Sequence, residues 1–218
     1  MIPRPLRSLA IVAMLVFAAA CSATPAASPS SAVVPPSVAP SSASGCPTTQ
    51  PAAMPQGETR SVAIETSQGT ITLLVQADLS PIAVGNFVAL AECGYYDGVV
   101  FHRLVPGFVI QGGDPTGTGT GGPGYTIKDE PVETDYHRGT VAMARTSSPD
   151  SVGSQFFIVL DDQAQGALAS ANTYQIIGEV TDGMDAVDAI AAMPNSGEAT
   201  GNQALDPVPM TSVTVSNP

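Results

Sequence analysis

The chain has 218 residues, enough for one domain of ordinary size with additional segments. Charged residues make up only 12%, and 21 glycines with 20 prolines favour a turn-rich β structure over a helical bundle. The net charge of −12 argues against polyanionic partners, and we expect no nucleic acid among them. Beyond the N-terminal segment, the basic residues are too few and too scattered for a phosphate-binding patch: Arg60, Arg103, Lys128, Arg138 and Arg145.

Residues 1–20 have the pattern of a secretory signal peptide, with two arginines followed by an apolar run and small residues before Cys21. The run is too short to span a bilayer stably. Its end resembles the lipobox of bacterial lipoproteins, in which the cysteine is diacylated and becomes the new N-terminus. The resemblance implies lipidation of Cys21, export, and an extracytoplasmic location anchored to the cell membrane. Ordinary cleavage is the alternative, because Ala18 stands where lipoboxes usually carry Leu.

Residues 21–57 are expected to comprise the lipidated cysteine and a disordered tether. The segment is rich in Ala, Pro, Ser, Thr and Val and has neither charge nor periodicity. Such a composition cannot bury enough apolar surface to order itself. The folded domain is therefore expected over residues 58–218, and its single domain and negative charge favour a monomer.

The three cysteines allow two interpretations. If Cys21 carries lipid, Cys46 and Cys93 remain as an even pair in an oxidising compartment, where exposed thiols usually form disulfides. A disulfide between them would tie the end of the tether to the domain. In the other interpretation Cys46 is a free thiol and Cys93 is a small core residue.

Short β-prone runs recur between turn signals throughout the predicted domain. Eight candidate strands cover residues 61–65, 70–76, 99–103, 108–111, 140–143, 155–160, 174–180 and 211–215. This pattern predicts an all-β sandwich or barrel.

Two helices are predicted between these strands. The first has Ser80 as its N-cap and Pro81 at the first helical position, and it stops at Gly94. The second opens at Asp182, whose carboxylate suits a helix N-terminus.

Two segments carry candidate chemistry. In residues 101–115, Arg103 stands among apolar residues and turn formers, which is costly unless something uses its charge. A snorkelling arginine paired with a carboxylate is the structural alternative.

In residues 153–159, strand alternation places Gln155 and Phe157 on one face, which fits a peptide-binding groove. A buried glutamine beside a core phenylalanine is the alternative.

The segment from about residue 69 to residue 190 resembles cyclophilins in four ordered motifs: FHRLVPGFVIQGGD, VAMARTSSPDSVGSQFF, GSQFFI and NTYQIIGEV. The resemblance implies a mainly β fold, an eight-stranded closed antiparallel β-barrel capped by two α-helices. It also implies a peptidyl-prolyl cis/trans isomerase that assists the folding of exported or surface proteins, with proline-containing polypeptides as substrates and no cofactor. A non-catalytic chaperone module that binds proline peptides is the alternative. His102 and His137 lack zinc-ligand spacing, so no metal is expected.

The resemblance also assigns roles to individual residues. Arg103 matches the family's catalytic arginine, and Gln111 matches its substrate-anchoring glutamine. Further substrate-binding matches are Phe108, Val109, Phe157 and Leu168 for the proline pocket, Ala144, Arg145 and Gln155 for the preceding residue's groove, and Tyr174, where many animal members have histidine. Strict alternation would place Phe108 and Gln111 on opposite faces, so a bulge or a turn at Phe108 is required.

Overall fold

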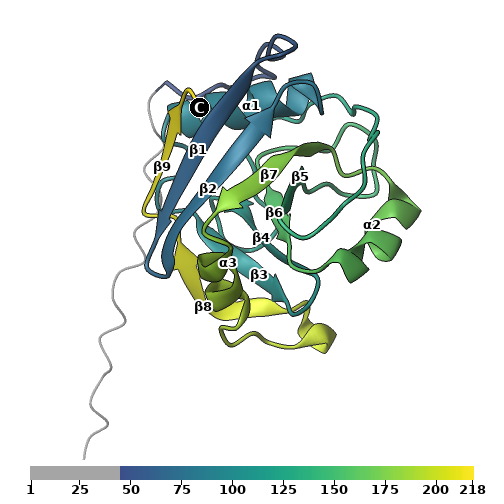
Figure 1. The fold of residues 1–218 in the computed structure, drawn as a ribbon. Coiled ribbons are helices and arrows are strands. Elements are labelled where there is room, and N and C mark those ends of the chain that lie inside the picture. Colours follow the sequence, from purple (N-terminus) through teal and green to yellow (C-terminus); the bar gives the residue numbers. More distant parts are fainter. Residues whose placement is uncertain (1–44) are drawn as a thin grey trace, which may run out of the picture. The chain divides into compact units, whose positions relative to one another are not determined.

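The computed structural model describes residues 45–218, whose elements are shown in Figure 1. This part of the chain contains nine strands: β1 Thr59–Thr66, β2 Gly69–Gln76, β3 Val100–Val105, β4 Val109–Asp114, β5 Thr140–Met143, β6 Phe156–Val159, β7 Ile176–Asp182, β8 Gln203–Pro209 and β9 Ser212–Ser216. They form one antiparallel sheet in the order β8-β3-β4-β6-β5-β7-β2-β1-β9. The protein is therefore mainly β, as predicted.

The sheet departs from the predicted closed barrel of eight strands. Strand β8 was missed because it is mostly exposed, and its Pro207 and Pro209 lack the N–H that a ladder needs. Within the described residues no ladder joins β8 to β9, which lie at opposite ends of the sheet order. Only Met210 and Thr211 separate these two strands in the chain. The sheet therefore curls far enough to bring the end of β8 within roughly 10 Å of the start of β9, the reach of three residue steps.

The main core lies between the curled sheet and two helices, α1 Pro81–Glu92 and α3 Met184–Ala191. Alternate residues of β1 and β2 are fully buried in it, as the two-residue period of a strand predicts. An aromatic group packs at its centre, where the ring of Phe87 on α1 meets Phe156 edge to face with centroids 5.4 Å apart.

The helices differ from the prediction in number and in one boundary. Helix α3 begins at Met184 with Gly183 as its N-cap, because Asp182 is still part of β7. Helix α2 Gln165–Ala171 was not predicted, since it is only seven residues long and buries Leu168 alone. Short 3₁₀ turns at Asp162–Ala164 and Glu198–Thr200 complete the described elements.

Residues 45–57, assigned by sequence to the disordered tether, lie against α1. The backbone N–H of Met54 donates to the carbonyl of Pro81 at 2.9 Å, and the Met54 side chain is buried. A Cβ at Gly85 would overlap the backbone oxygen of Ala52, so the segment approaches α1 at a distance that only glycine permits. The ordered domain therefore begins before residue 58.

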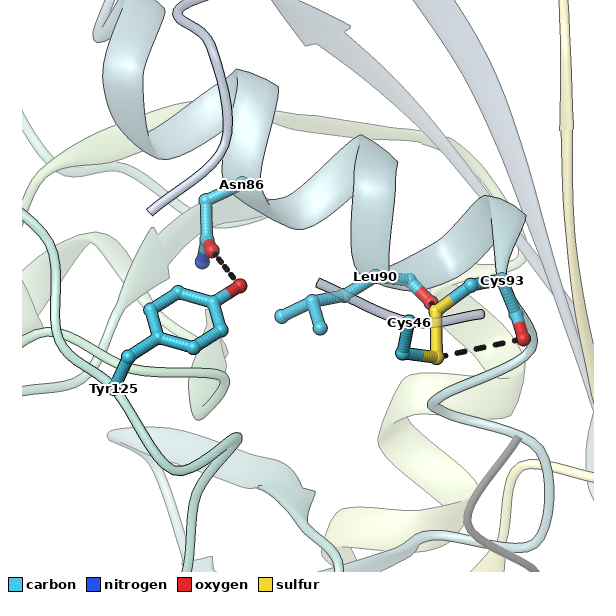
Figure 2. Close-up of a disulfide and its surroundings, with 5 residues drawn as sticks. All are labelled: Cys46, Asn86, Leu90, Cys93 and Tyr125. Carbon is cyan, nitrogen blue, oxygen red and sulfur yellow. Dashed lines mark hydrogen bonds between the residues drawn. A yellow bond between two sulfur atoms is a disulfide. The ribbon is translucent and has the colours of Figure 1, made fainter. Parts of the chain in front are cut away.

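A covalent bond joins the same segment to the end of α1. Cys46 and Cys93 form a disulfide with an S–S distance of 2.05 Å, directly beyond the last turn of the helix (Figure 2). One turn further back, Leu90 is fully buried in the main core. The segment is thus attached to an element that is itself anchored in the core.

The predicted signal peptide, residues 1–20, and the predicted lipidation site, Cys21, lie outside the described residues. Among residues 45–218, no helix has both the length and the apolar character needed to cross a membrane.

Candidate active site

Arg103 and Gln111 face each other across neighbouring strands. They are register partners in the β3–β4 pair, and Arg103 Nη1 donates to Gln111 Oε1 at 3.3 Å. Arg103 Nε donates to the carbonyl of Gly201, also at 3.3 Å, in the loop before β8. The guanidinium is therefore held beside Gln111, and two partners from different elements define its position.

A bulge at His102 makes this placement compatible with the core. The register of β3 shifts between Phe101 and Arg103 against both of its neighbours. Phe101 and Leu104 are both buried in the main core, although they are three positions apart and strict alternation would put them on opposite faces. Because the bulge takes up the extra residue, both point inward while Arg103 stays partly exposed.

Arg103 differs from the other cations of the described chain in having no acidic partner. Ion pairs join the remaining four basic residues to carboxylates: Arg60–Glu58, Lys128–Asp150, Arg138–Asp188 and Arg145–Asp129. Within residues 45–218, Arg103 contacts only an amide oxygen and a carbonyl oxygen through hydrogen bonds. The alternative of a snorkelling arginine paired with a carboxylate is wrong, and the positive charge remains available to a ligand.

The predicted pocket residues gather in a second hydrophobic cluster, separate from the main core. Six of them belong to it: Phe108, Val109, Ala144, Phe157, Leu168 and Tyr174. Phe157 is buried and is the β6 register partner of Gln111, so the apolar cluster begins directly beside the polar pair. The ring of Tyr174 packs edge to face on Phe157 with centroids 5.4 Å apart and remains partly exposed.

Phe108 reaches this cluster from a turn rather than from a strand. It lies in the turn between β3 and β4, where its N–H donates to the carbonyl of Val105 at 3.0 Å. Its own carbonyl accepts from the N–H of Leu160 at 2.9 Å. The turn removes Phe108 from the alternation of β4, which resolves the conflict between Phe108 and Gln111.

A groove of about 650 Å³ lies beside Gln111 and shares Ala144 with the apolar cluster. Four predicted residues line it: Gln111, Ala144, Arg145 and Gln155. The glycine-rich loop of residues 119–125 also lines the groove and forms a wall that the sequence prediction missed. A repeated Thr-Gly pattern that begins at Thr116, two residues after Asp114, is the signal that could have indicated it.

Arg145 shapes the groove through its own loop. Its Nη1 donates to Asp129 at 2.9 Å and its Nη2 to the carbonyl of Ser148 at 2.7 Å. Only 8% of the side chain is exposed. The guanidinium is thus used to hold the loop that follows β5, and Arg145 contributes to the wall of the groove.

Burial shifts the pKa values of two further side chains near the site. Burial raises the pKa of Tyr136 to about 12, so its hydroxyl stays protonated and donates to the carbonyl of Tyr174 at 2.9 Å. Neither ring nitrogen of the buried His102 has a hydrogen-bond partner among the described residues, and burial lowers the pKa of this imidazole. Across residues 45–218, no three His, Cys, Asp or Glu side chains gather in an arrangement that could hold a metal ion.

Comparison with known proteins agrees with this geometry. Residues 61–215 match the family model described as cyclophilin type peptidyl-prolyl cis-trans isomerase/CLD. A peptidyl-prolyl cis-trans isomerase of Helicobacter pylori is 37% identical over 148 residues, which cover 63% of this chain and 90% of that protein. A putative bifunctional phosphatase/peptidyl-prolyl cis-trans isomerase of Streptococcus pyogenes is 50% identical over 102 residues, or 45% of this chain, and the match spans only 22% of that longer protein.

A solved structure shows the same likeness in three dimensions. The crystal structure of a Cryptosporidium parvum cyclophilin type peptidyl-prolyl cis-trans isomerase, determined in the presence of the dipeptide Ala-Pro, matches with a TM-score of 0.64 and 32% identity. The match covers 72% of this chain and 99% of that structure.

Proposed function

Because the chain belongs to the cyclophilin type peptidyl-prolyl cis-trans isomerase family, we propose that it catalyses cis/trans isomerisation of X-Pro bonds in polypeptides. One observation carries this proposal: Arg103 has no carboxylate partner among the described residues, yet two hydrogen bonds hold it beside Gln111. A protein that only bound proline peptides would not need an uncompensated guanidinium at this place. Catalysis by transition-state stabilisation does need one.

The reaction requires no nucleophile, because the obstacle is amide resonance with a barrier of about 20 kcal/mol. As the bond twists, the prolyl nitrogen becomes pyramidal and gains a lone pair that can accept a hydrogen bond. A donor placed at that nitrogen interacts with the twisted state and not with either planar state, so it lowers the barrier. Arg103 is the donor in this mechanism.

One hydrogen bond does not supply the whole effect. Acceleration from tens of seconds to milliseconds is a factor of about 10⁴, which corresponds to about 5.5 kcal/mol. A hydrogen bond to a charged group contributes about 1.5 to 3 kcal/mol. The remainder comes from orientation of the substrate carbonyl by Gln111 and from removal of water around the proline ring by Phe108, Phe157 and Leu168.

A coupled isomerisation assay on the purified chain, run beside Arg103→Ala, tests this function. Turnover by the unmodified chain with loss in the variant supports it. If both proteins bind a proline peptide with equal affinity and neither accelerates isomerisation, the non-catalytic binding module is the correct interpretation.

We also propose that the chain is an exported lipoprotein, anchored through Cys21 and acting as a monomer on the proline-containing segments of exported or surface proteins. The lipobox-like motif supports the anchor, and the Cys46–Cys93 disulfide supports export because such bonds persist in oxidising compartments. Mass spectrometry of the mature N-terminus tests the lipid directly. A mature chain that begins with an unmodified residue would contradict the anchor.

A further inference from the structure

The carboxylate of Asp114 organises the glycine-rich wall of the groove. Asp114 ends β4 and is fully buried. Its Oδ1 accepts from the N–H of Thr116 at 2.7 Å, and its Oδ2 accepts from the N–H groups of Thr118 at 3.2 Å, Gly119 at 2.6 Å and Gly121 at 2.9 Å. Four backbone donors of the next seven residues thus converge on one side chain, which wraps the loop around it.

This loop in turn presents two carbonyl groups to Gln155. Gln155 Nε2 donates to the carbonyl of Gly119 at 3.1 Å and to that of Gly121 at 2.9 Å. A side-chain amide nitrogen has two hydrogens, and both are used here. The amide cannot rotate by half a turn without setting its oxygen against these carbonyl oxygens, so Oε1 is directed at Gln111.

Gln155 in turn fixes the orientation of the Gln111 amide. Gln111 Nε2 donates to Gln155 Oε1 at 2.9 Å, which leaves Gln111 Oε1 to accept from Arg103. We propose that Asp114 is a positioning residue for isomerisation, acting through the loop and Gln155 to set the orientation of the Gln111 amide and, through it, the guanidinium of Arg103. The inference rests on the proposed function and adds a residue that touches neither the substrate pocket nor the guanidinium.

A carboxylate is required for this arrangement. Burial alone would raise the pKa of Asp114, but hydrogen bonds from the Gly121 backbone and from the side chain and backbone of Thr116 outweigh it and lower the pKa, so the group is ionised at neutral pH. In Asp114→Asn, whichever oxygen is replaced by NH₂ meets backbone N–H donors. The loop must then move, because two donors cannot share one site.

Gly121 offers a second way to disturb the same contact. A Cβ at this position would overlap Oδ1 of Asp114, so Gly121→Ala displaces the carboxylate without changing its chemistry. Glu130→Gln is the matched control. The Glu130 carboxylate also accepts hydrogen bonds from two backbone N–H groups, those of Ile82 and Ala83, but it has no hydrogen bond to the glycine-rich loop.

The experiment measures kcat/KM, stability and the side-chain amide signals of Gln111 and Gln155 by NMR in the full mature chain and in these three variants. We expect Asp114→Asn and Gly121→Ala to shift both pairs of amide signals and to lower kcat/KM at least about 10-fold, since misplacement by about 1 Å can cost about 100-fold. Glu130→Gln should leave the amide signals in place and kcat/KM within about twofold.

Unchanged amide signals in Asp114→Asn, or an equal loss of kcat/KM in Glu130→Gln at equal stability, would overturn the inference. If Asp114→Asn does not fold, Gly121→Ala gives the decision on the same criteria. Absence of isomerase activity in the unmodified chain would refute the proposed function instead. In that case the amide signals alone still decide whether Asp114 orients the two glutamines.

Discussion

Glu130, rather than Ser80, caps the N-terminus of α1. The two carboxylate oxygens of Glu130 accept from the N–H groups of Ile82 at 2.8 Å and Ala83 at 2.9 Å. Ser80 occupies the N-cap position, but it makes no side-chain cap, and its buried hydroxyl has no hydrogen-bond partner among the described residues. The free donors of the first turn are therefore satisfied by an acidic residue from a loop 48 positions later in the chain.

This relationship predicts that only one of two alanine substitutions lowers stability substantially. Glu130→Ala should lower the free energy of unfolding by about 1 to 2 kcal/mol. It leaves two backbone donors unpaired and removes a negative charge that interacts favourably with the N-terminal end of the helix dipole. Ser80→Ala should change stability by less than about 0.5 kcal/mol, because no hydrogen bond is lost. Urea unfolding of both variants checks the pair. A larger loss in Ser80→Ala would show that Ser80 is the cap in solution.

Removal of the Arg103 guanidinium should affect catalysis and leave the fold intact. We expect Arg103→Ala to lower kcat/KM at least about 100-fold, the loss of roughly 3 kcal/mol of transition-state stabilisation. The matched control is Arg60→Ala, which removes a guanidinium on β1 that pairs with Glu58 and should keep activity within about twofold. Near-normal turnover by Arg103→Ala would remove this residue from the mechanism.

The Cys46–Cys93 disulfide should stabilise the whole domain, because it closes a loop of 47 residues and holds residues 45–57 against α1. Replacement of both cysteines by serine should lower the free energy of unfolding by about 2 to 4 kcal/mol. Thiol titration of the folded chain, with and without reductant, together with thermal unfolding, measures the effect. Reduction should destabilise the unmodified chain and leave the double variant unchanged. Equal melting temperatures of the oxidised and the reduced chain would contradict this role.

Acidification should destabilise the domain through His102. Burial lowers the pKa of its imidazole and outweighs the nearby charge of Asp114, which acts in the opposite direction. Between this lowered pKa and the ordinary histidine pKa of about 6.5, the unfolded chain therefore binds a proton at His102 that the folded chain does not bind. This contribution to stability is complete above that pH and is lost as the pH falls toward the lower value of the folded state.

Urea unfolding as a function of pH, in the unmodified chain and in two variants, isolates this contribution. His102→Gln should remove the loss of stability that sets in as the pH falls below about 6.5, while His137→Gln, at an exposed position, should retain it. An unaltered pH profile in His102→Gln would show that another group titrates.

Much of the fold follows from local patterns in the sequence. Each of the eight predicted strands overlaps one in the structure, and helix α1 runs from Pro81 toward Gly94 as expected. These elements have strong signals, namely apolar alternation, a proline at the first helical turn and glycine at the end. Strand β8 and helix α2 carry no such signal, because each buries little apolar surface.

The sequence by itself determined which residue types the chain carries to its site, since Arg103, Gln111 and the pocket residues all stand in recognisable motifs. Their arrangement was decided only by tertiary structure. The bulge at His102, the cap from Glu130 and the loop wrapped around Asp114 each join residues through contacts that local periodicity does not encode. The physical reason is that backbone donors, buried charges and side-chain amides must find partners wherever the folded chain offers them, and that depends on which segments the curled sheet brings together.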